Sequence, residues 1–198
     1  MPRITELSYL ELDIKTPLPT RTAEMDAGGR IIGASSAPCW EWRSYREEND
    51  SEFREVMRNT YRESLDMPEL GRIRSLDEII ADHRKAGRFE PSRWQIGRLP
   101  GDPEAAAVLL MTEANLPEPD SWEVIYLGLT PAARGRGLGH KVIERAVELA
   151  APHASRIELA VDVRNTPALR LYEKAGFTAI DRRVVHLAVL ESDKTAQP

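Results

Sequence analysis

Apolar residues along this chain recur with two spacings, one typical of strands and the other typical of helices. Alternating or continuous apolar residues predict strands at residues 39–46, 93–99, 106–112, 122–130, 156–163 and 177–190. Apolar residues three or four positions apart predict helices at residues 51–64, 75–87, 138–150 and 166–175. The order β-α-α-β-β-β-α-β-α-β predicts an α/β fold built around a mixed sheet.

The two ends of the chain differ from this pattern. Residues 1–38 are interrupted by prolines and glycines, which predicts a peripheral N-terminal arm with at most two short strands, near residues 7–14 and 30–33. Residues 39–190 are expected to form one domain, and residues 191–198 a disordered tail. Charged residues within residues 1–18 leave no continuous apolar segment there, so no secretory signal is expected.

The composition is that of an ordinary globular domain, since 41% of the 198 residues are hydrophobic and 30% are charged. The formal net charge of -5 argues against a nucleic-acid partner, because such proteins carry a basic surplus. No stretch approaches the ~20 apolar residues of a membrane span, so no membrane partner is expected. The single cysteine, Cys39, excludes a disulfide within the chain and indicates a reducing, cytoplasmic compartment. The four histidines are not spaced as metal ligands, so no metal is expected.

The chemistry is concentrated in the hexapeptide RGRGLG, residues 134–139, which joins a predicted strand to an amphipathic helix. Its glycines let the backbone turn sharply and approach a ligand without a Cβ clash. The unpaired N–H groups of the following helix's first turn point back at this loop and favour an anion. Two arginines add positive charge and hydrogen-bond donors. We therefore predict a phosphate or pyrophosphate site formed by Arg134, Gly135, Arg136, Gly137, Leu138 and Gly139.

Other phosphate-binding motifs fit this loop less well. A Walker A loop needs a lysine and a serine or threonine after its last glycine, and His140 and Lys141 do not supply that ending. A dinucleotide fingerprint needs the spacing G-x-G-x-x-G, which the three glycines here do not have. A glycine-rich turn that binds nothing is a further alternative for the hexapeptide alone.

Two signatures in the chain resemble those of the GNAT superfamily of acetyl-CoA-dependent N-acetyltransferases. Arg134-x-x-Gly137-x-Gly139 matches the pattern R/Q-x-x-G-x-G/A, and residues 165–177 are similar to N-x-x-A-x-x-L-Y-x-x-x-G-F. The resemblance covers about residues 39–190 and is most specific over residues 123–177. It implies a mixed sheet flanked by helices on both faces, acetyl-CoA as cosubstrate, an amine as acceptor, and direct attack in a ternary complex.

The resemblance also implies which residues hold the cofactor. In GNAT proteins the pantetheine arm lies beside the strand that precedes the glycine loop, where it would bind backbone groups of Leu127, Gly128 and Leu129. Gly128 fits such a close approach, and it also fits a simple bulge. Asn165 matches the position that hydrogen-bonds the pantetheine or the phosphate side of the cofactor, and it equally fits a helix cap.

Two residues are the catalytic candidates that the resemblance implies. Tyr172 matches the tyrosine near the cofactor sulfur, which can protonate or hydrogen-bond the departing thiolate. An ordinary core tyrosine is the alternative interpretation. Glu123 precedes Arg134 by eleven residues and matches a glutamate that serves as general base; an exposed strand carboxylate is its alternative. The fallback bases are Glu113, Asp162 and Tyr126, and a backbone N–H of Leu127 or Leu129 could bind the developing oxyanion.

The acceptor is not set by the fold or the cofactor. In the family, the region equivalent to residues 62–74 helps to form the acceptor site, but its mixed charges favour no single amine. A small amine, an amino acid, an antibiotic and a protein amine all stay open. The second candidate function is a non-catalytic CoA-binding sensor or assembly subunit on the same fold, and the third is a nucleotide-binding protein.

The end of the chain departs from the family pattern. A standard GNAT domain ends in a hairpin, but residues 177–190 contain no Gly, Pro or Asn turn. Either the hairpin is very tight, or there is one long final strand whose edge must be covered. The N-terminal arm or a second subunit could cover it, and a homodimer is therefore one option.

Overall fold

The computed structural model describes residues 3–16, 24–25, 31–32, 40–69, 73–114 and 120–186. A seven-stranded sheet of order β4-β5-β6-β7-β8-β1-β9 forms its centre. The strands are β1 (Arg3–Asp13), β4 (Glu41–Ser44), β5 (Trp94–Arg98), β6 (Ala105–Glu113), β7 (Ser121–Leu129), β8 (Arg156–Asp162) and β9 (Thr178–His186). A separate ribbon pairs β2 (Glu24–Met25) with β3 (Ile31–Ile32). Cys39 and the predicted tail at 191–198 lie outside the described residues.

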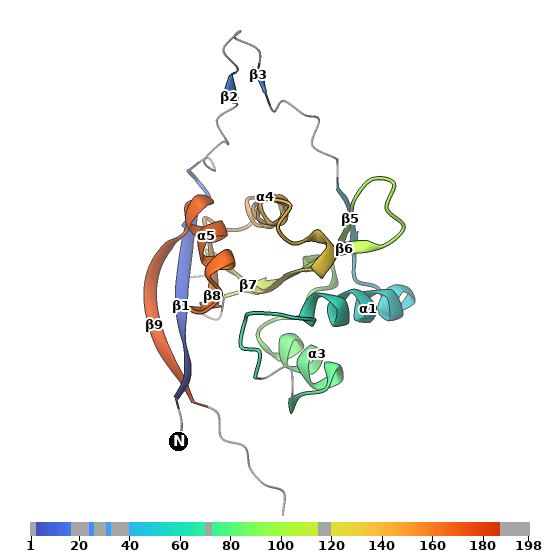
Figure 1. Ribbon diagram of the computed structural model, residues 1–198, viewed down its shortest axis with the longest axis horizontal. Coiled ribbons are helices and arrows are strands. Elements are labelled where there is room, and N and C mark those ends of the chain that lie inside the picture. Colours follow the sequence, from blue (N-terminus) through green and yellow to red (C-terminus); the bar gives the residue numbers. More distant parts are fainter. Residues whose placement is uncertain are drawn as a thin grey trace, which may run out of the picture.

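Helices cover the sheet on both faces (Figure 1). The helices α1 (Asp50–Tyr61) and α3 (Leu76–Lys85) lie on one side, and α4 (Gly139–Ala150) and α5 (Thr166–Lys174) lie on the other. Short 3-10 turns occur at Glu47–Asn49, Pro91–Arg93 and Pro131–Ala133. This arrangement confirms the predicted α/β fold. Among the described residues, no helix is long and apolar enough to cross a membrane.

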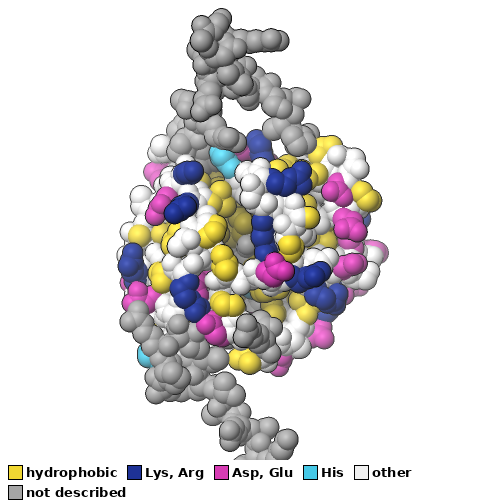
Figure 2. Space-filling view, in the orientation of Figure 1, with side chains coloured by type: hydrophobic (Ala, Val, Ile, Leu, Met, Phe, Trp, Pro, Cys, Tyr) yellow, Lys and Arg dark blue, Asp and Glu magenta, His cyan; other side chains and the backbone are white. Residues whose placement is uncertain are grey.

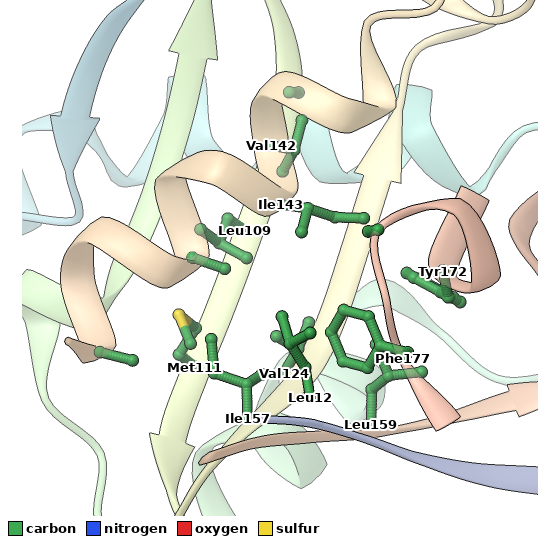
Figure 3. Close-up of a cluster of buried hydrophobic side chains, with 14 of the residues drawn as sticks. Leu12, Leu109, Met111, Val124, Val142, Ile143, Ile157, Leu159, Tyr172 and Phe177 are labelled. Atoms are coloured by element: carbon green, nitrogen blue, oxygen red, sulfur yellow. The ribbon is translucent and has the colours of Figure 1, made fainter. Parts of the chain in front are cut away.

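Each face of the sheet has its own hydrophobic cluster. On the α4–α5 face, alternate residues of β8 (Ile157, Leu159 and Val161) pack against Val142 and Ile143 of α4. Figure 3 shows these α4 side chains above those of the sheet. The other cluster joins α1 and α3 to β5 and β6. Because β6 is covered on both faces, nearly all of its residues are buried, and its sequence is continuously apolar rather than alternating.

Local signals in the sequence set the helix boundaries. Ser75 caps α3, since its hydroxyl accepts from the Glu78 N–H while the Glu78 carboxylate accepts from the Ser75 N–H. The N-cap of α5 is Asn165, and Pro167 lies in the first turn of the helix. The Asn165 side chain accepts from the Ala168 N–H at 3.3 Å.

The predicted peripheral arm is wrong for β1. This strand lies inside the sheet, antiparallel to β8 on one side and to β9 on the other. Leu10 and Leu12 are only 3% and 4% exposed, because they face the same core as α4 and α5. The strand expected near residues 7–14 does exist, but the boundary expected at residue 39 excludes a strand that lies inside the sheet, next to the edge strand β9.

The position of β1 also shows how the final strand is paired. For the described residues, the chain ends in one strand, β9, which pairs with β1 from Arg3↔His186 to Glu11↔Thr178. The segment at the N-terminus thus covers the edge that β8 would otherwise expose. The strand β9 becomes the new edge, where Ile180 and Val184 are exposed. A second subunit at this edge stays a prediction.

Replacing Leu10 with alanine should therefore destabilise the whole domain. We expect Leu10→Ala to lower the free energy of unfolding by about 2–4 kcal/mol, because it leaves a cavity in the core. The control is Ile180→Ala on β9, where the side chain is 53% exposed and the loss should stay below about 1 kcal/mol. Denaturant unfolding measures both values, and similar losses for the two variants would contradict an internal β1.

Candidate functional site

The parallel strands β7 and β8 separate halfway along their length. Their pairing runs from Ser121↔Arg156 to Val124↔Leu159 and then stops. On its other side, β7 changes register against β6 at the same place, so that Ile125 is the extra residue of a bulge. Beyond Val124, residues of β7 and β8 line opposite walls of a cleft of about 540 Å³. Figure 2 shows a hollow with hydrophobic side chains at the centre of this view.

The glycine loop and the start of α4 form one end of this cleft. Gly135 and Gly137 have φ angles of 71° and 72°, a left-handed conformation that favours glycine. The helix then begins at Gly139, and Leu138 provides no side-chain cap for its first N–H groups. A Cβ at Gly139 would lie 2.6 Å from Leu171 Cδ2, so this glycine allows α4 and α5 to approach closely. The result is a concave set of backbone donors suited to a phosphate group.

The two arginines of the glycine loop make different hydrogen bonds. The guanidinium of Arg134 donates to the carbonyls of Leu129 at 3.1 Å, Glu63 at 3.1 Å and Thr60 at 2.7 Å. It therefore ties the glycine loop to the end of α1. The exposed Arg136 makes one long contact, at 3.5 Å, to the Ala132 carbonyl. Of these two guanidinium groups, Arg136 is the one whose donors are largely available for a phosphate.

In the structure, packing against α1 explains why position 128 is a glycine, and not the close approach of a ligand that the sequence suggested. A Cβ there would lie 2.6 Å from the Tyr126 hydroxyl and 2.8 Å from Thr60 Cβ. The glycine thus allows α1 to pack closely against β7. The bulge alternative is wrong for Gly128, because the register shift lies at Ile125. Leu127, Gly128 and Leu129 nevertheless line the cleft, with their backbone no longer paired to β8.

Asn165 and Tyr172 reach the same cleft from α5. Asn165 caps the helix, as its alternative interpretation required. Tyr172 is 7% exposed, and its ring meets Phe177 edge-on at 5.6 Å, so it also belongs to the core (Figure 3). Burial and the nearby charge of Asp66 raise the pKa of the Tyr172 hydroxyl. The hydroxyl therefore keeps its proton at neutral pH and can act as a hydrogen-bond donor.

Glu123 is not among the residues that line the cleft. It lies on the paired part of β7, opposite Thr112 on β6 and Glu158 on β8. This is the α1–α3 face of the sheet, because the neighbouring Trp122 and Val124 point into the α4–α5 core. Burial and the charge of Glu158 raise the pKa of the Glu123 carboxyl, so it binds a proton more readily than an exposed glutamate.

The three fallback bases all have partners. Glu113 pairs with Arg93 at 2.6 Å, and this hydrogen bond lowers the pKa of its carboxyl. The Tyr126 hydroxyl donates to Thr60 at 2.9 Å. Asp162 is 0% exposed; burial alone would raise its pKa, but hydrogen bonds from Arg164 and Thr5 outweigh burial and lower it. None of the three is as available for proton transfer as the sequence suggested.

A second cavity, of about 950 Å³, opens on the α1–α3 side. It shares part of its wall with the first cleft, namely Glu63, Ser64, Leu65, Asp66, Ile125, Tyr126 and Ala160. The predicted acceptor loop does line it. Side chains of α3 and Leu7 on β1 also line it, and neither is marked by a motif in the sequence.

Aromatic side chains form one wall of this second cavity. Tyr61 and Tyr126 stack with ring centroids 4.6 Å apart, and the Tyr61 hydroxyl lies 2.9 Å from Nε2 of His83. Burial lowers the pKa of His83 to about 4, so its ring is neutral at neutral pH. The wall is thus uncharged, while charged residues lie on the loop and along the rim.

A cleft between diverging parallel strands, closed by a glycine loop and an uncapped helix, defines an acyl-CoA-binding class of domain. The chain belongs to the acetyltransferase (GNAT) family, whose profile matches residues 39–177. A mycothiol acetyltransferase from Rhodococcus erythropolis is 34% identical over 68% of this chain and 45% of its own length. One from Beutenbergia cavernae is 37% identical over 46% of this chain and 30% of its own length. The chain thus matches less than half the length of these relatives.

Solved structures share the fold at low identity. A GCN5-related N-acetyltransferase from Sphaerobacter thermophilus superposes with a TM-score of 0.62 at 16% identity, over 92% of this chain and 51% of that chain. A chain of the NatC complex bound to Gag peptide and CoA gives a TM-score of 0.51 at 16% identity, over 68% of this chain and 81% of its own. These similarities establish the GNAT fold that the sequence predicted.

The different contacts of the two arginines lead to a stability test. We expect Arg134→Met to lower the free energy of unfolding by about 1–3 kcal/mol without any ligand, because charge-assisted hydrogen bonds to backbone carbonyls are lost. The matched control, Arg136→Met, should change it by less than about 0.5 kcal/mol. Equal values for both variants in urea unfolding would show that Arg134 does not hold α1 in place.

Proposed function

We propose that this chain is an N-acetyltransferase that transfers the acetyl group of acetyl-CoA to a primary amine. One observation carries the proposal: the β7 edge left unpaired beyond Val124 leads directly to the glycine loop. An extended ligand with amide groups can bind Leu127, Gly128 and Leu129 as an added strand would. Its pyrophosphate would lie on the N–H groups between Gly135 and Gly139, beside Arg136.

The proposed mechanism is direct attack in a ternary complex. The acceptor enters from the second cavity, and its nitrogen forms a bond to the thioester carbonyl carbon. A backbone N–H of Leu127 or Leu129 stabilises the negative oxygen. The C–S bond then breaks, and Tyr172 donates its proton to the leaving sulfur. An amine that enters as an ammonium ion loses one proton before the attack, to Glu123 through water, because Glu123 lies outside the cleft lining. The second proton, lost from nitrogen after the attack, restores the hydroxyl of Tyr172.

Two observations bear on the acceptor: the size of its cavity and the name of the similar proteins. The acceptor cavity can hold a small molecule, and the relatives' name points to mycothiol chemistry. We therefore favour a low-molecular-weight amine. We also propose a cytoplasmic location, from the single cysteine, and no nucleic-acid partner, from the net charge of -5. We further propose that two copies of the chain associate through the β9 edge. We also propose that the reaction needs no metal ion.

Purified protein should release the CoA thiol from acetyl-CoA only when an acceptor is added. The panel consists of glucosamine, amines related to mycothiol, amino acids and a peptide with a free N-terminus. Thiol detection and mass spectrometry of the acetylated product measure the reaction. Tight CoA binding by calorimetry with no transfer to any amine would replace this proposal with the non-catalytic CoA sensor.

The catalytic residues can be tested separately from cofactor binding. We expect Tyr172→Phe and Glu123→Gln each to lower kcat by about tenfold or more, since each removes a proton-transfer group, while the Kd for CoA changes little. Tyr45→Phe, which removes a hydroxyl in the other core, is the control and should keep kcat within about threefold. If both catalytic variants lose less than tenfold, the assigned roles are wrong although the fold stands.

A further inference from the structure

The loop between α1 and α3 has an unusual backbone. Among the described residues, only Glu63 and Met67 combine a side chain with a positive φ, at 55° and 41°. They bracket residues 64–66. Such conformations cost about 1–3 kcal/mol each and persist only where surrounding contacts impose them. The segment between them is therefore held in a specific shape.

Asp162, at the end of β8, supplies the contacts that impose this shape. Its Oδ2 accepts from the Met67 N–H at 3.2 Å, and its own N–H donates to Asp66 Oδ1 at 2.8 Å. Thr5 on β1 and Arg164 hold the same buried carboxylate. Both carboxylate oxygens of Asp162 thus accept hydrogen bonds from the surrounding chain. The backbone N–H of Asp162 fixes the orientation of the Asp66 carboxylate.

Asp66 is placed where the two cavities meet. It lines both of them, together with Tyr126. Only its Oδ1 is held, since in the described part of the chain no group bonds to Oδ2. The first cleft is also lined by Tyr172, the residue proposed to donate to the leaving sulfur, so Asp66 and the proposed sulfur position belong to the same cleft. Asp66 therefore has one oxygen available at the point where an acceptor would meet the thioester.

Several of the other charged groups nearby already have partners. Asp82 is paired with Arg74 across the second cavity. Arg164 is held by Asp162 and Glu69, and Arg134 by backbone carbonyls. His83 is neutral at neutral pH, as described above. Three further charged side chains line this cavity and are exposed: Arg58 on α1, and Arg62 and Glu63 directly after it.

We infer that Asp66 binds the ammonium group of the acceptor and positions its nitrogen beside the thioester. The acceptor class is then a primary amine that enters as a cation, with its carbon skeleton against the Tyr61–Tyr126 wall. An ionic hydrogen bond to Oδ2 selects an amine over a hydroxyl of the same shape. This role rests on the proposed function and is distinct from the proton transfer assigned to Glu123 and Tyr172.

The role predicts a specific pH dependence. Burial raises the pKa of the Asp66 carboxyl, so the group becomes neutral at a higher pH than an exposed aspartate. As pH falls through this raised pKa, the attraction for an ammonium group is lost and the amine should bind more weakly. With asparagine at position 66, this acidic limb should disappear.

The test is Asp66→Asn, because asparagine keeps an oxygen for the Asp162 N–H and removes only the charge. We expect the KM for the amine, and its Kd on the CoA-loaded protein, to rise by about tenfold or more. The KM for acetyl-CoA should stay within about twofold. Asp66→Glu should recover part of the amine affinity. Asp77→Asn removes one exposed charge from α3 outside both cavities, and its amine KM should stay within about threefold.

Calorimetry with the panel amines keeps the two proposals separable. If the wild-type protein transfers acetyl groups and Asp66→Asn has an unchanged amine KM, Asp66 is not the acceptor site although the function stands. If transfer is absent but an amine binds the CoA-loaded wild type more tightly than the variant, the function fails and the Asp66 site stands. Equal amine binding by both proteins, or no amine binding at all, overturns the Asp66 site.

Discussion

The end of the β7–β8 pairing at Val124 is the constraint on which the rest of the site depends. The bulge at Ile125 rotates β7 away from β8 and leaves one of its edges without a hydrogen-bonding partner. Such an edge can pair with an extended ligand that supplies amide groups. The same divergence makes room for the glycine loop and orients the first turn of α4 toward the cleft.

Two charged residues fix the wall between the cofactor cleft and the acceptor cavity. Arg134 joins the glycine loop to the end of α1. Asp162 joins β8 to the loop that follows α1. Arg134 bonds to backbone carbonyls, and Asp162 bonds to the Met67 and Arg164 N–H groups as well as to side chains, so both define where chain segments lie. A buried charge with all of its hydrogen bonds satisfied is well suited to this task, because any displacement leaves it unpaired. Cofactor binding and acceptor binding thus share one set of supports.

The sequence predicted the elements whose apolar residues repeat within a single segment, such as α4 and β8. It also predicted the glycine loop from its motif. The turn at residues 134–139 was predictable because positive φ angles at Gly135 and Gly137 require glycine. The position of β1 was not, since pairing partners about 150 residues away leave no local signal. The role of Asp66 was also hidden: in the sequence it is one acid in a mixed loop, and only the contact with Asp162 gives it a direction.

The position of β1 between β8 and β9 has a consequence for the synthesis of this protein. The strand β1 leaves the ribosome before β8 and β9, the two strands with which it pairs. This part of the sheet therefore cannot close until β9 has been made, and until β8 and β9 emerge the hydrogen-bonding edges of β1 stay exposed. Contacts between such distant residues slow folding and prolong the time in which a chain can aggregate. We expect chaperone dependence to be greatest for nascent chains in which β1 is complete and β9 is still missing.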